Sequence, residues 1–451
     1  MSITVRHRIT ARLRLGINGR GRVWAARGAL GRWASIQTVV RSSKYRNIGT
    51  ATVDRRRGTD MKQKFPTDRA EKRRALLQAV DNVRDILAAN AEEGEVIRTL
   101  PQASVVALRE SGLFTLKLPA VLGGAEADPV TQIEVIEAVS YIDPATGWSF
   151  FIGTGGGSMC AFWPDEAIAQ MFRGGRIPTL AGAFRIGGKA VAVDGGYRVT
   201  GRWSWASGIR HAEWVAAHVL VERQGSDRPE PRIVVVPVSD LTIHDTWHVA
   251  GLKGTGSCDF SLTDCFVPEG FTFDSQAMQP QRGGPLYQLG LPGLLVNELA
   301  GFALGVGRRA LDAIIELAHT KRRGYGKQMP LAERAVFQRV LGESDLRLRA
   351  ARGLIIETFE KAWQTVCTGR RPEPALQVEM SSATTWVTDV ALEVTTQAFR
   401  YGGGTAVHLN HILQRCLRDL QVGASHLMVS DASYERHGQC LLGLPGVDPM
   451  G

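Results

Sequence analysis

The sequence predicts an α+β protein in which an N-terminal helical domain, a central antiparallel β-domain and a C-terminal four-helix bundle follow one another. Two patterns predict this class. Apolar residues recur every three or four positions in residues 61–178 and 286–451, whereas residues 179–285 alternate in short runs broken by Gly, Pro and Asp. The composition agrees, because 451 residues with 44% hydrophobic and 22% charged side chains suffice for several globular domains.

The first helical domain is expected to open with a capped amphipathic helix. Asp68 has a short polar side chain that can accept a hydrogen bond from the backbone at a helix start. The apolar residues behind it recur at spacings of three and four, which is the buried stripe of such a helix. These residues are Leu76, Leu77, Val80, Val83 and Leu87.

The β-domain contains the most informative segment of the chain, Gly196–Trp214. Apolar residues stand at every second position at its start, with polar residues between them, which predicts a half-buried strand. Asp194-Gly195-Gly196 predicts a hairpin turn before this strand, and Ser207-Gly208 ends it. The residues expected on the buried face are Val199, Gly201, Trp203 and Trp205.

Long helical patterns return after residue 294. They cover Leu299–His319, Ala332–Cys367 and Ala375–Phe399, and turns that carry Gly or Pro separate them. Helices of this length, joined by short turns, are typical of a four-helix bundle.

The first sixty residues differ from the rest of the chain in charge. They hold 14 Lys and Arg against 2 Asp and Glu, and subtracting these from the totals of 54 and 44 leaves 40 basic and 42 acidic residues. The net charge of +10 therefore belongs to Met1–Asp60, and the nearly neutral body predicts no nucleic-acid surface. This leader is a disordered tail, a transit-like presequence, or upstream sequence that is translated although the protein starts at Met61.

The six cysteines predict a reduced, cytoplasmic setting, because they are widely spaced and include no Cys-x-x-Cys pair. His408 and His411 could share a helical face, but no nearby Cys or Glu completes a metal site, so we expect no metal. The most apolar stretch, Leu286–Gly307, is interrupted by Asn297 and Glu298, so we expect a soluble protein with no membrane partner.

Several blocks carry a family resemblance in a constant order. Gly112–Pro129 and Tyr141–Phe150 resemble a helical entry segment, and Trp247–Phe271 is similar to the later strands of a β-domain. RWSWASG resembles a Trp-x-Thr motif, and RRGYG, at Arg322–Gly326, resembles Arg-x-x-Phe-Gly. From about residue 112 to residue 428, these blocks resemble the acyl-CoA dehydrogenase superfamily. The resemblance implies the order of helices, sheet and helices that the patterns predict.

The same resemblance implies a flavin site. It places Trp205 and Ser207 against the isoalloxazine ring, near its N5 edge. Arg322 and the glycine pair Gly403-Gly404 match residues that approach the flavin of a neighbouring subunit, and the fold family implies a homotetramer. Glycine suits this place because it permits a close approach of the backbone.

The expected catalytic carboxylate of the family is absent. Asp419 matches the Asp of the family's Arg-Asp pair, and most dehydrogenases carry a catalytic Glu eight residues later, where this chain has Leu427 with His426 beside it. Other dehydrogenases carry that Glu on an earlier helix. The matching offset falls near Leu295, and Glu298 is only a near miss.

His426, Ser207 and the LQR-x-x-RD run at Leu413–Asp419 together resemble the oxygenase components of two-component flavin monooxygenases. That subgroup includes 4-hydroxyphenylacetate hydroxylase, steroid-phenol hydroxylase and dibenzothiophene monooxygenase. The resemblance implies hydroxylation of an aromatic or polycyclic small molecule by reduced FMN or FAD and O2, through a C4a-hydroperoxide. A separate NAD(P)H-dependent flavin reductase is the implied partner. The alternative is an acyl-CoA dehydrogenase.

The resemblance assigns the catalytic roles to Ser207 and His426. Ser207 can hydrogen-bond N5 or the peroxide, and His426 can do acid–base chemistry because an imidazole titrates near neutral pH. An aromatic group and one further histidine are candidates for the substrate pocket, although aromatic residues more often form core. These candidates are Trp148, Phe151, Trp163 and His211.

We expect Met1–Asp60 to be dispensable for folding, because this leader has unbalanced basic charge and no apolar face to bury. A chain that starts at Met61 should be soluble and should melt at the same temperature as the full chain. Soluble yield and thermal unfolding of the two chains test this. Loss of soluble protein, or a drop in Tm of more than a few degrees, would show that the leader packs.

Overall fold

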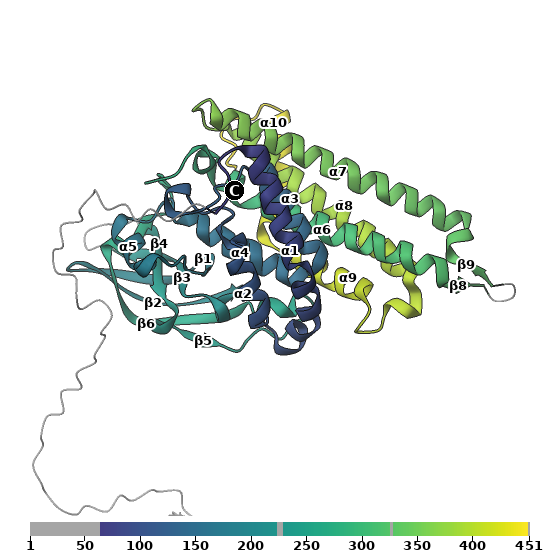
Figure 1. Cartoon of the computed structure of the whole chain (residues 1–451). Coiled ribbons are helices and arrows are strands. Elements are labelled where there is room, and N and C mark those ends of the chain that lie inside the picture. The colour runs from purple at the N-terminus through teal and green to yellow at the C-terminus, as the bar shows by residue number, and fades with distance from the viewer. Residues whose placement is uncertain (1–63, 223–228, 325–327, 450–451) are drawn as a thin grey trace, which may run out of the picture. The chain divides into compact units, whose positions relative to one another are not determined.

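The computed structural model describes residues 64–222, 229–324 and 328–449, which belong to one compact unit, Gly58–Gly451. In this unit the predicted order of helices, sheet and helices is confirmed (Figure 1). The leader Met1–Asp60 lies outside the described residues, so its three interpretations stay open.

The N-terminal helical part begins as the sequence predicts. The Asp68 side chain accepts a hydrogen bond of 2.9 Å from the backbone N–H of Glu71, and the helix behind it buries Leu76, Val80, Val83 and Leu87, while Leu77 is half-buried. The helices of this part are α1 (Arg69–Ile97), α2 (Gln102–Glu110), α3 (Pro129–Ile142), α4 (Pro144–Met159) and α5 (Asp165–Met171).

Within the described residues, seven strands form one sheet in the order β5-β6-β2-β1-β3-β4-β7. The predicted hairpin joins β1 to β2 through Asp194 and Gly195. The domain is not wholly antiparallel, because the chain crosses after β2 to the other side of β1, so that β3 runs parallel to β1. The strands are β1 (Leu180–Val193), β2 (Gly196–Ala206), β3 (Trp214–Glu222), β4 (Glu230–Pro237), β5 (Thr242–His244), β6 (Cys258–Pro268) and β7 (Thr272–Asp274).

The C-terminal part packs four helices on one another, with a fifth, short helix against α8. The helices are α6 (Gly290–Thr320), α7 (Ala335–Cys367), α8 (Pro374–Ala406), α9 (Ile412–Gly423) and α10 (Ala432–Leu441). A small hairpin of β8 (Arg322–Arg323) and β9 (Met329–Pro330) follows α6. Among the described residues, α6 alone is long and apolar enough to cross a membrane, and 89% of that apolar window is buried inside the protein, as in a core helix.

One helix of the N-terminal part, α4, contacts both the sheet and the C-terminal bundle. α4 packs against β1 of the sheet and against α6 and α9 of the bundle. Figure 1 shows the sheet and the long C-terminal helices on opposite sides of the N-terminal helices. A side chain on α4 can therefore reach both the sheet and the bundle.

A buried carboxylate ties the β-domain to the bundle. Asp419, on α9, is fully buried, and its Oδ1 accepts a hydrogen bond of 2.6 Å from the backbone N–H of Leu252. Next to it Arg418 donates to the carbonyl of Ala250 at 3.1 Å and forms an ion pair with Glu95. The Arg-Asp pair thus holds the loop between β5 and β6. Burial raises the pKa of Asp419 from 3.8 to about 7, against the opposing effect of the Leu252 N–H.

We expect Asp419→Asn to flatten the pH dependence of stability. A carboxyl whose folded pKa is raised holds its proton in the folded state, so its contribution is full below pH 3.8 and is lost as pH rises towards about 7. The amide does not titrate, and its oxygen can still accept from Leu252. Between pH 4 and pH 7 the free energy of unfolding of the Asp419→Asn variant should therefore rise relative to that of the native chain. Urea titrations at several pH values measure both free energies. Parallel pH curves for the two chains would contradict this.

Candidate active site

Trp148 on α4 brings the two predicted catalytic residues together. Its indole N–H donates to Ser207 Oγ at 3.0 Å. Its ring lies edge-on to His426, with centroids 5.8 Å apart, and also packs against Phe151 at 4.8 Å and Phe302 of α6 at 5.1 Å. We call these five residues the Trp148 cluster. It joins the helical domain, the sheet and the bundle at one point.

Two further hydroxyl groups stand behind Ser207. Ser257 Oγ lies 2.7 Å from Ser207 Oγ and 2.7 Å from Thr255 Oγ1, and Thr255 Oγ1 donates to the carbonyl of Leu252 at 2.8 Å. The backbone N–H of Gly208 also donates to the carbonyl of Thr255, at 2.9 Å. Ser207 is therefore held by side-chain and backbone bonds to the loop that Asp419 anchors.

The alternation predicted Trp205 on the buried face of its strand, but the structure places its side chain outside that face. Trp203 is 1% exposed and stacks on Phe260, whereas Trp205 is 62% exposed. The register of β2 against β6 shifts between Trp203 and Ala206, and Trp205 has a φ of 67°. This irregularity turns the indole outward, as β-bulges do beside active sites. A non-glycine residue at positive φ costs about 1–3 kcal/mol, so the surrounding structure must hold Trp205 in this conformation.

His426 is a neutral imidazole that presents a donor. Burial lowers its pKa from 6.5 to about 4. Its Nδ1 accepts a hydrogen bond of 3.3 Å from the backbone N–H of Met428, so in the neutral ring the proton resides on Nε2. Leu427, the residue at the family's carboxylate position, is 65% exposed.

His211 lies beneath the turn that carries Ser207. A Cβ on Gly208 would come within 3.0 Å of His211 Nε2, and the ring centroid is 6.5 Å from that of Phe114. Burial and the nearby Arg109 cation lower the pKa of His211 to about 4. His211 thus supports the Ser207 turn from below, and its place in a substrate pocket stays a prediction.

Trp163, a predicted pocket residue, lies in a different aromatic group. It is fully buried and packs edge-on against Phe273 of β7, with centroids 4.6 Å apart. Phe273 also stacks on Phe162. The helix α4 that carries Trp148 ends at Met159, so the chain has already turned away and Trp163 packs in the core beneath β7. Trp163 is therefore not part of the Trp148 cluster, and its place in a substrate pocket stays a prediction.

The residues predicted to approach the flavin of a neighbouring subunit lie far from the Trp148 cluster within one chain. Figure 1 shows β8, which carries Arg322, at the end of the bundle remote from the sheet. Arg322 and Gly404 are exposed. Arg323, not Arg322, packs at the break in α8: it donates to the carbonyl of Arg400 at 3.0 Å, and a Cβ on Gly403 would lie 2.4 Å from its Nη2. Tyr325 and Gly326 of the RRGYG motif lie outside the described residues.

The carboxylate of the alternative function is engaged elsewhere. Glu298 forms a buried ion pair of 2.7 Å with Lys117, whose side chain is 0% exposed. Burial raises the pKa of Glu298 to about 7, and the Lys117 cation opposes that rise. Glu298 faces Gly155 of α4, where a Cβ would come within 3.3 Å of its carboxylate oxygens. It is therefore enclosed between α4 and α6.

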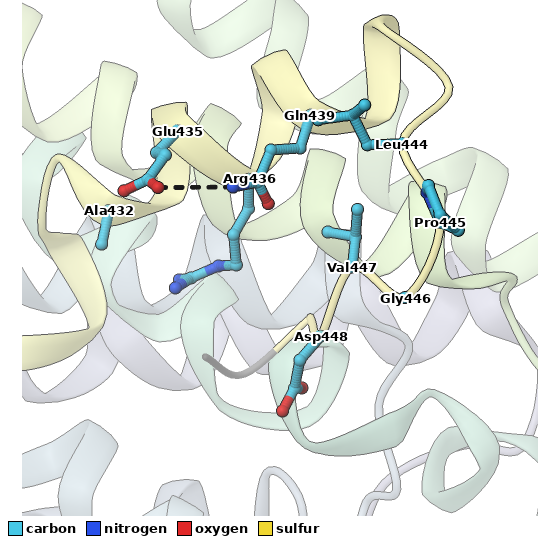
Figure 2. Close-up of a pocket in the computed structure, with 9 residues that line it drawn as sticks. All are labelled: Ala432, Glu435, Arg436, Gln439, Leu444, Pro445, Gly446, Val447 and Asp448. Atoms are coloured by element: carbon cyan, nitrogen blue, oxygen red, sulfur yellow. Dashed lines mark hydrogen bonds between the residues drawn. The ribbon is translucent and has the colours of Figure 1, made fainter.

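A separate cavity of about 380 Å³ lies at the C-terminal end of the chain (Figure 2). Gln439 donates to Glu435 one turn earlier on α10, at 3.3 Å. Its lining comes entirely from α10 and the segment after it, so it shares no residue with the Trp148 cluster. The lining residues are Ala432, Glu435, Arg436, Gln439, Leu444, Pro445, Gly446, Val447 and Asp448.

Three residues of the site were not predicted from the sequence. Thr255 and Ser257 lie in a segment that resembled the family's β-domain, but nothing in the local pattern distinguishes them from turn residues. Phe302 had a usable signal, because it lies one helical turn after Glu298 and so shares its face of α6 towards α4.

The chain matches two family models and several proteins of known activity. The models are "Acyl-CoA dehydrogenase, N-terminal domain" over residues 70–171 and "Acyl-CoA dehydrogenase, C-terminal domain" over residues 298–431. The chain is 30% identical over 370 residues to indole-3-acetate monooxygenase of Pseudomonas putida, which covers 81% of this chain and 94% of that protein. It is 29% identical over 386 residues to the oxygenase component of an FADH2-dependent resorcinol hydroxylase of Rhizobium sp., with coverages of 82% and 94%.

Among solved structures, XiaF from Streptomyces sp. in complex with FADH2 and glycerol is similar to this chain with a TM-score of 0.80. The two sequences are 26% identical, and the match covers 85% of this chain and 98% of that one.

Proposed function

Because the chain belongs to the acyl-CoA dehydrogenase family, we propose that it is the oxygenase component of a two-component flavin-dependent monooxygenase that hydroxylates an aromatic small molecule. Its relatives of known activity are monooxygenases or hydroxylases. One observation carries the proposal: a serine hydroxyl and a neutral imidazole meet on Trp148, and the Trp148 cluster contains no carboxylate, which the dehydrogenase reaction needs as its base.

The geometry disfavours the alternative, an acyl-CoA dehydrogenase. That reaction removes a proton from the carbon next to a thioester, and a leucine at position 427 cannot accept one. Glu298, the near miss, is paired with Lys117 and enclosed by Gly155. To act as a base it would have to leave Lys117 as an uncompensated buried cation, and breaking such a pair costs about 3–5 kcal/mol.

The described residues fit a planar flavin ring beside Ser207. Trp205 offers an exposed indole face at a strained backbone position, and a flat heterocycle packed on it would cover that face. Reduced flavin, when bound, supplies the electrons that activate O2. Trp148, Phe151 and Phe302 offer an apolar, water-poor wall to an aromatic substrate. With its proton on Nε2 and its Nδ1 engaged by the Met428 N–H, His426 can donate a hydrogen bond from Nε2.

The flavin would be FMN or FAD, delivered in reduced form by a separate NAD(P)H-dependent flavin reductase. XiaF was solved with FADH2, and a second neighbour of this fold with FMN, so the fold accommodates either. We place the reaction in the cytoplasm, because all six cysteines are free thiols, as is usual in reducing compartments.

We further propose that the complete flavin site needs two copies of the chain in a homotetramer. Arg322 and Gly404 are exposed at the end of the bundle remote from the sheet, so they cannot reach a flavin that lies on Trp205 of the same chain. A guanidinium and open glycine backbone suit phosphate groups. A neighbouring copy that brings its Arg322 to the sheet would complete the site.

We expect Ser207→Ala and His426→Ala to lower product formation by about 10²-fold or more, while Tm changes by only a few degrees, because one positioned hydrogen bond at a reacting group contributes about 10²–10³-fold to rate. The assay supplies reduced FMN or FAD, O2 and a panel of phenols and indoles, with product measured by chromatography. Thr388→Val, a change on α8 that removes one buried hydroxyl, is the matched control and should keep native activity.

Two results would contradict the proposed function. The first is native turnover by both variants. The second is reduction of bound flavin by a panel of acyl-CoA thioesters, with no oxygen-dependent product from any aromatic compound. In the second case Glu298 would be the first residue to test.

If the flavin site is shared between copies, two inactive variants should complement each other. Arg322→Ala damages the bundle end and Ser207→Ala the sheet side, so a mixed oligomer contains some sites with both sides intact. Coexpression with two affinity tags, followed by purification of mixed oligomers, should recover up to about a quarter of native activity per site. Absence of recovery in confirmed mixed oligomers would show that each site is built within one chain.

A further inference from the structure

The hydroxyl groups behind Ser207 fix the direction in which its own hydrogen points. Thr255 Oγ1 lies 2.8 Å from the Leu252 carbonyl oxygen, which can only accept, so the single hydroxyl hydrogen of Thr255 is engaged there. Ser257, 2.7 Å from Thr255, must then donate to Thr255. Ser207, 2.7 Å from Ser257, must in turn donate to Ser257. The hydrogen of Ser207 therefore points away from the Trp148 cluster.

Trp148 supports this direction from the other side. Its indole nitrogen can only donate, and it gives its hydrogen to Ser207 Oγ at 3.0 Å. A hydroxyl oxygen has two lone pairs, so Ser207 keeps one lone pair and no hydrogen for any further partner. Ser207, Ser257 and Thr255 are 4%, 2% and 0% exposed, so bulk water does not offer them substitute partners.

We propose that Ser257 and Thr255 are positioning residues that make Ser207 a hydrogen-bond acceptor only, so that the site binds reduced flavin in preference to oxidised flavin. This inference rests on the proposed function, in which Ser207 faces N5 of the ring. N5 of reduced flavin carries a hydrogen and donates it. N5 of oxidised flavin carries none and can only accept, so it would face the Ser207 lone pair without a hydrogen between them.

The consequence for an oxygenase of this kind is direct. It must take up flavin that arrives reduced and release flavin that leaves oxidised. A serine that accepts but cannot donate favours both events. Neither Ser257 nor Thr255 needs to touch the flavin, because each acts by engaging the hydrogen of its neighbour.

The test measures the dissociation constants of the full-length chain for oxidised and for anaerobically reduced FMN and FAD. In the native chain the oxidised form should bind at least about 10-fold more weakly. In Ser257→Ala the hydrogen of Ser207 is released, and in Thr255→Val Ser257 can donate to Ser207 and release it in the same way. In each variant the ratio of the two constants should fall by about 3- to 10-fold, the worth of one hydrogen bond.

A second readout is the midpoint potential of the bound flavin, which needs no turnover. Stronger binding of the reduced form raises this potential, so both variants should lower it. A tenfold change in the ratio corresponds to about 30 mV for a two-electron couple, so the expected shift is about 15 to 30 mV.

Thr388→Val is the matched control. Thr388 is also buried, and its hydroxyl also donates to a backbone carbonyl, that of Thr384 at 2.9 Å, but it lies on α8 outside the hydroxyl chain. It should leave the ratio and the potential at native values. The Tm of every variant is measured alongside.

Three outcomes would overturn the inference. They are a native chain that binds both flavin forms equally, variants that keep the native ratio, and variants that weaken both forms by the same factor, as a purely structural role would. In all three the proposed function stands. A native chain that binds neither FMN nor FAD in either form would instead overturn the proposed function itself.

Discussion

The site depends on one line of buried hydrogen bonds that crosses all three parts of the fold. It starts at Asp419 in the bundle, passes through the loop from Leu252 to Ser257, and ends at Ser207 and Trp148. Each group on it is buried, so a break would leave a polar atom unpaired at about 1–3 kcal/mol. This penalty makes the relative placement of α9, the sheet and α4 a condition of stability, and the catalytic geometry follows from it.

The buried charges explain how this chain departs from a dehydrogenase without losing the fold. Lys117 and Glu298 neutralise each other between the first helical domain and α6, so the carboxylate has a packing role. Aromatic rings surround Trp148 instead of carboxylates: Phe302, one turn further along α6, and His426 both lie against it. The helix scaffold is thus retained while the chemistry of its inner face changes.

The sequence was sufficient for the fold because repeating patterns specify it. The stripe behind Asp68 and the turn at Asp194 each rest on several residues that agree. The site was predicted less completely, since single residues decide it. Trp205 leaves its strand face at one bulge, and Trp163 falls beyond the end of α4. The local sequence pattern predicts neither the bulge at Trp205 nor the end of α4 before Trp163. The hydroxyl of Ser257 is paired across fifty residues, and only the fold reveals that contact.

The Trp148 cluster carries no net charge. His426 and His211 both have pKa values lowered to about 4 by burial, so both are neutral at physiological pH. Lys117 and Glu298 are enclosed behind Gly155. In such a place hydrogen bonds are strong because the surroundings are weakly polarisable, and an unmatched donor or acceptor is correspondingly unfavourable. Selectivity then follows from which atoms carry hydrogens. Trp148, Ser207 and the hydroxyl groups behind Ser207 determine this arrangement of hydrogens. A charged residue in the same place would override the selectivity that it gives.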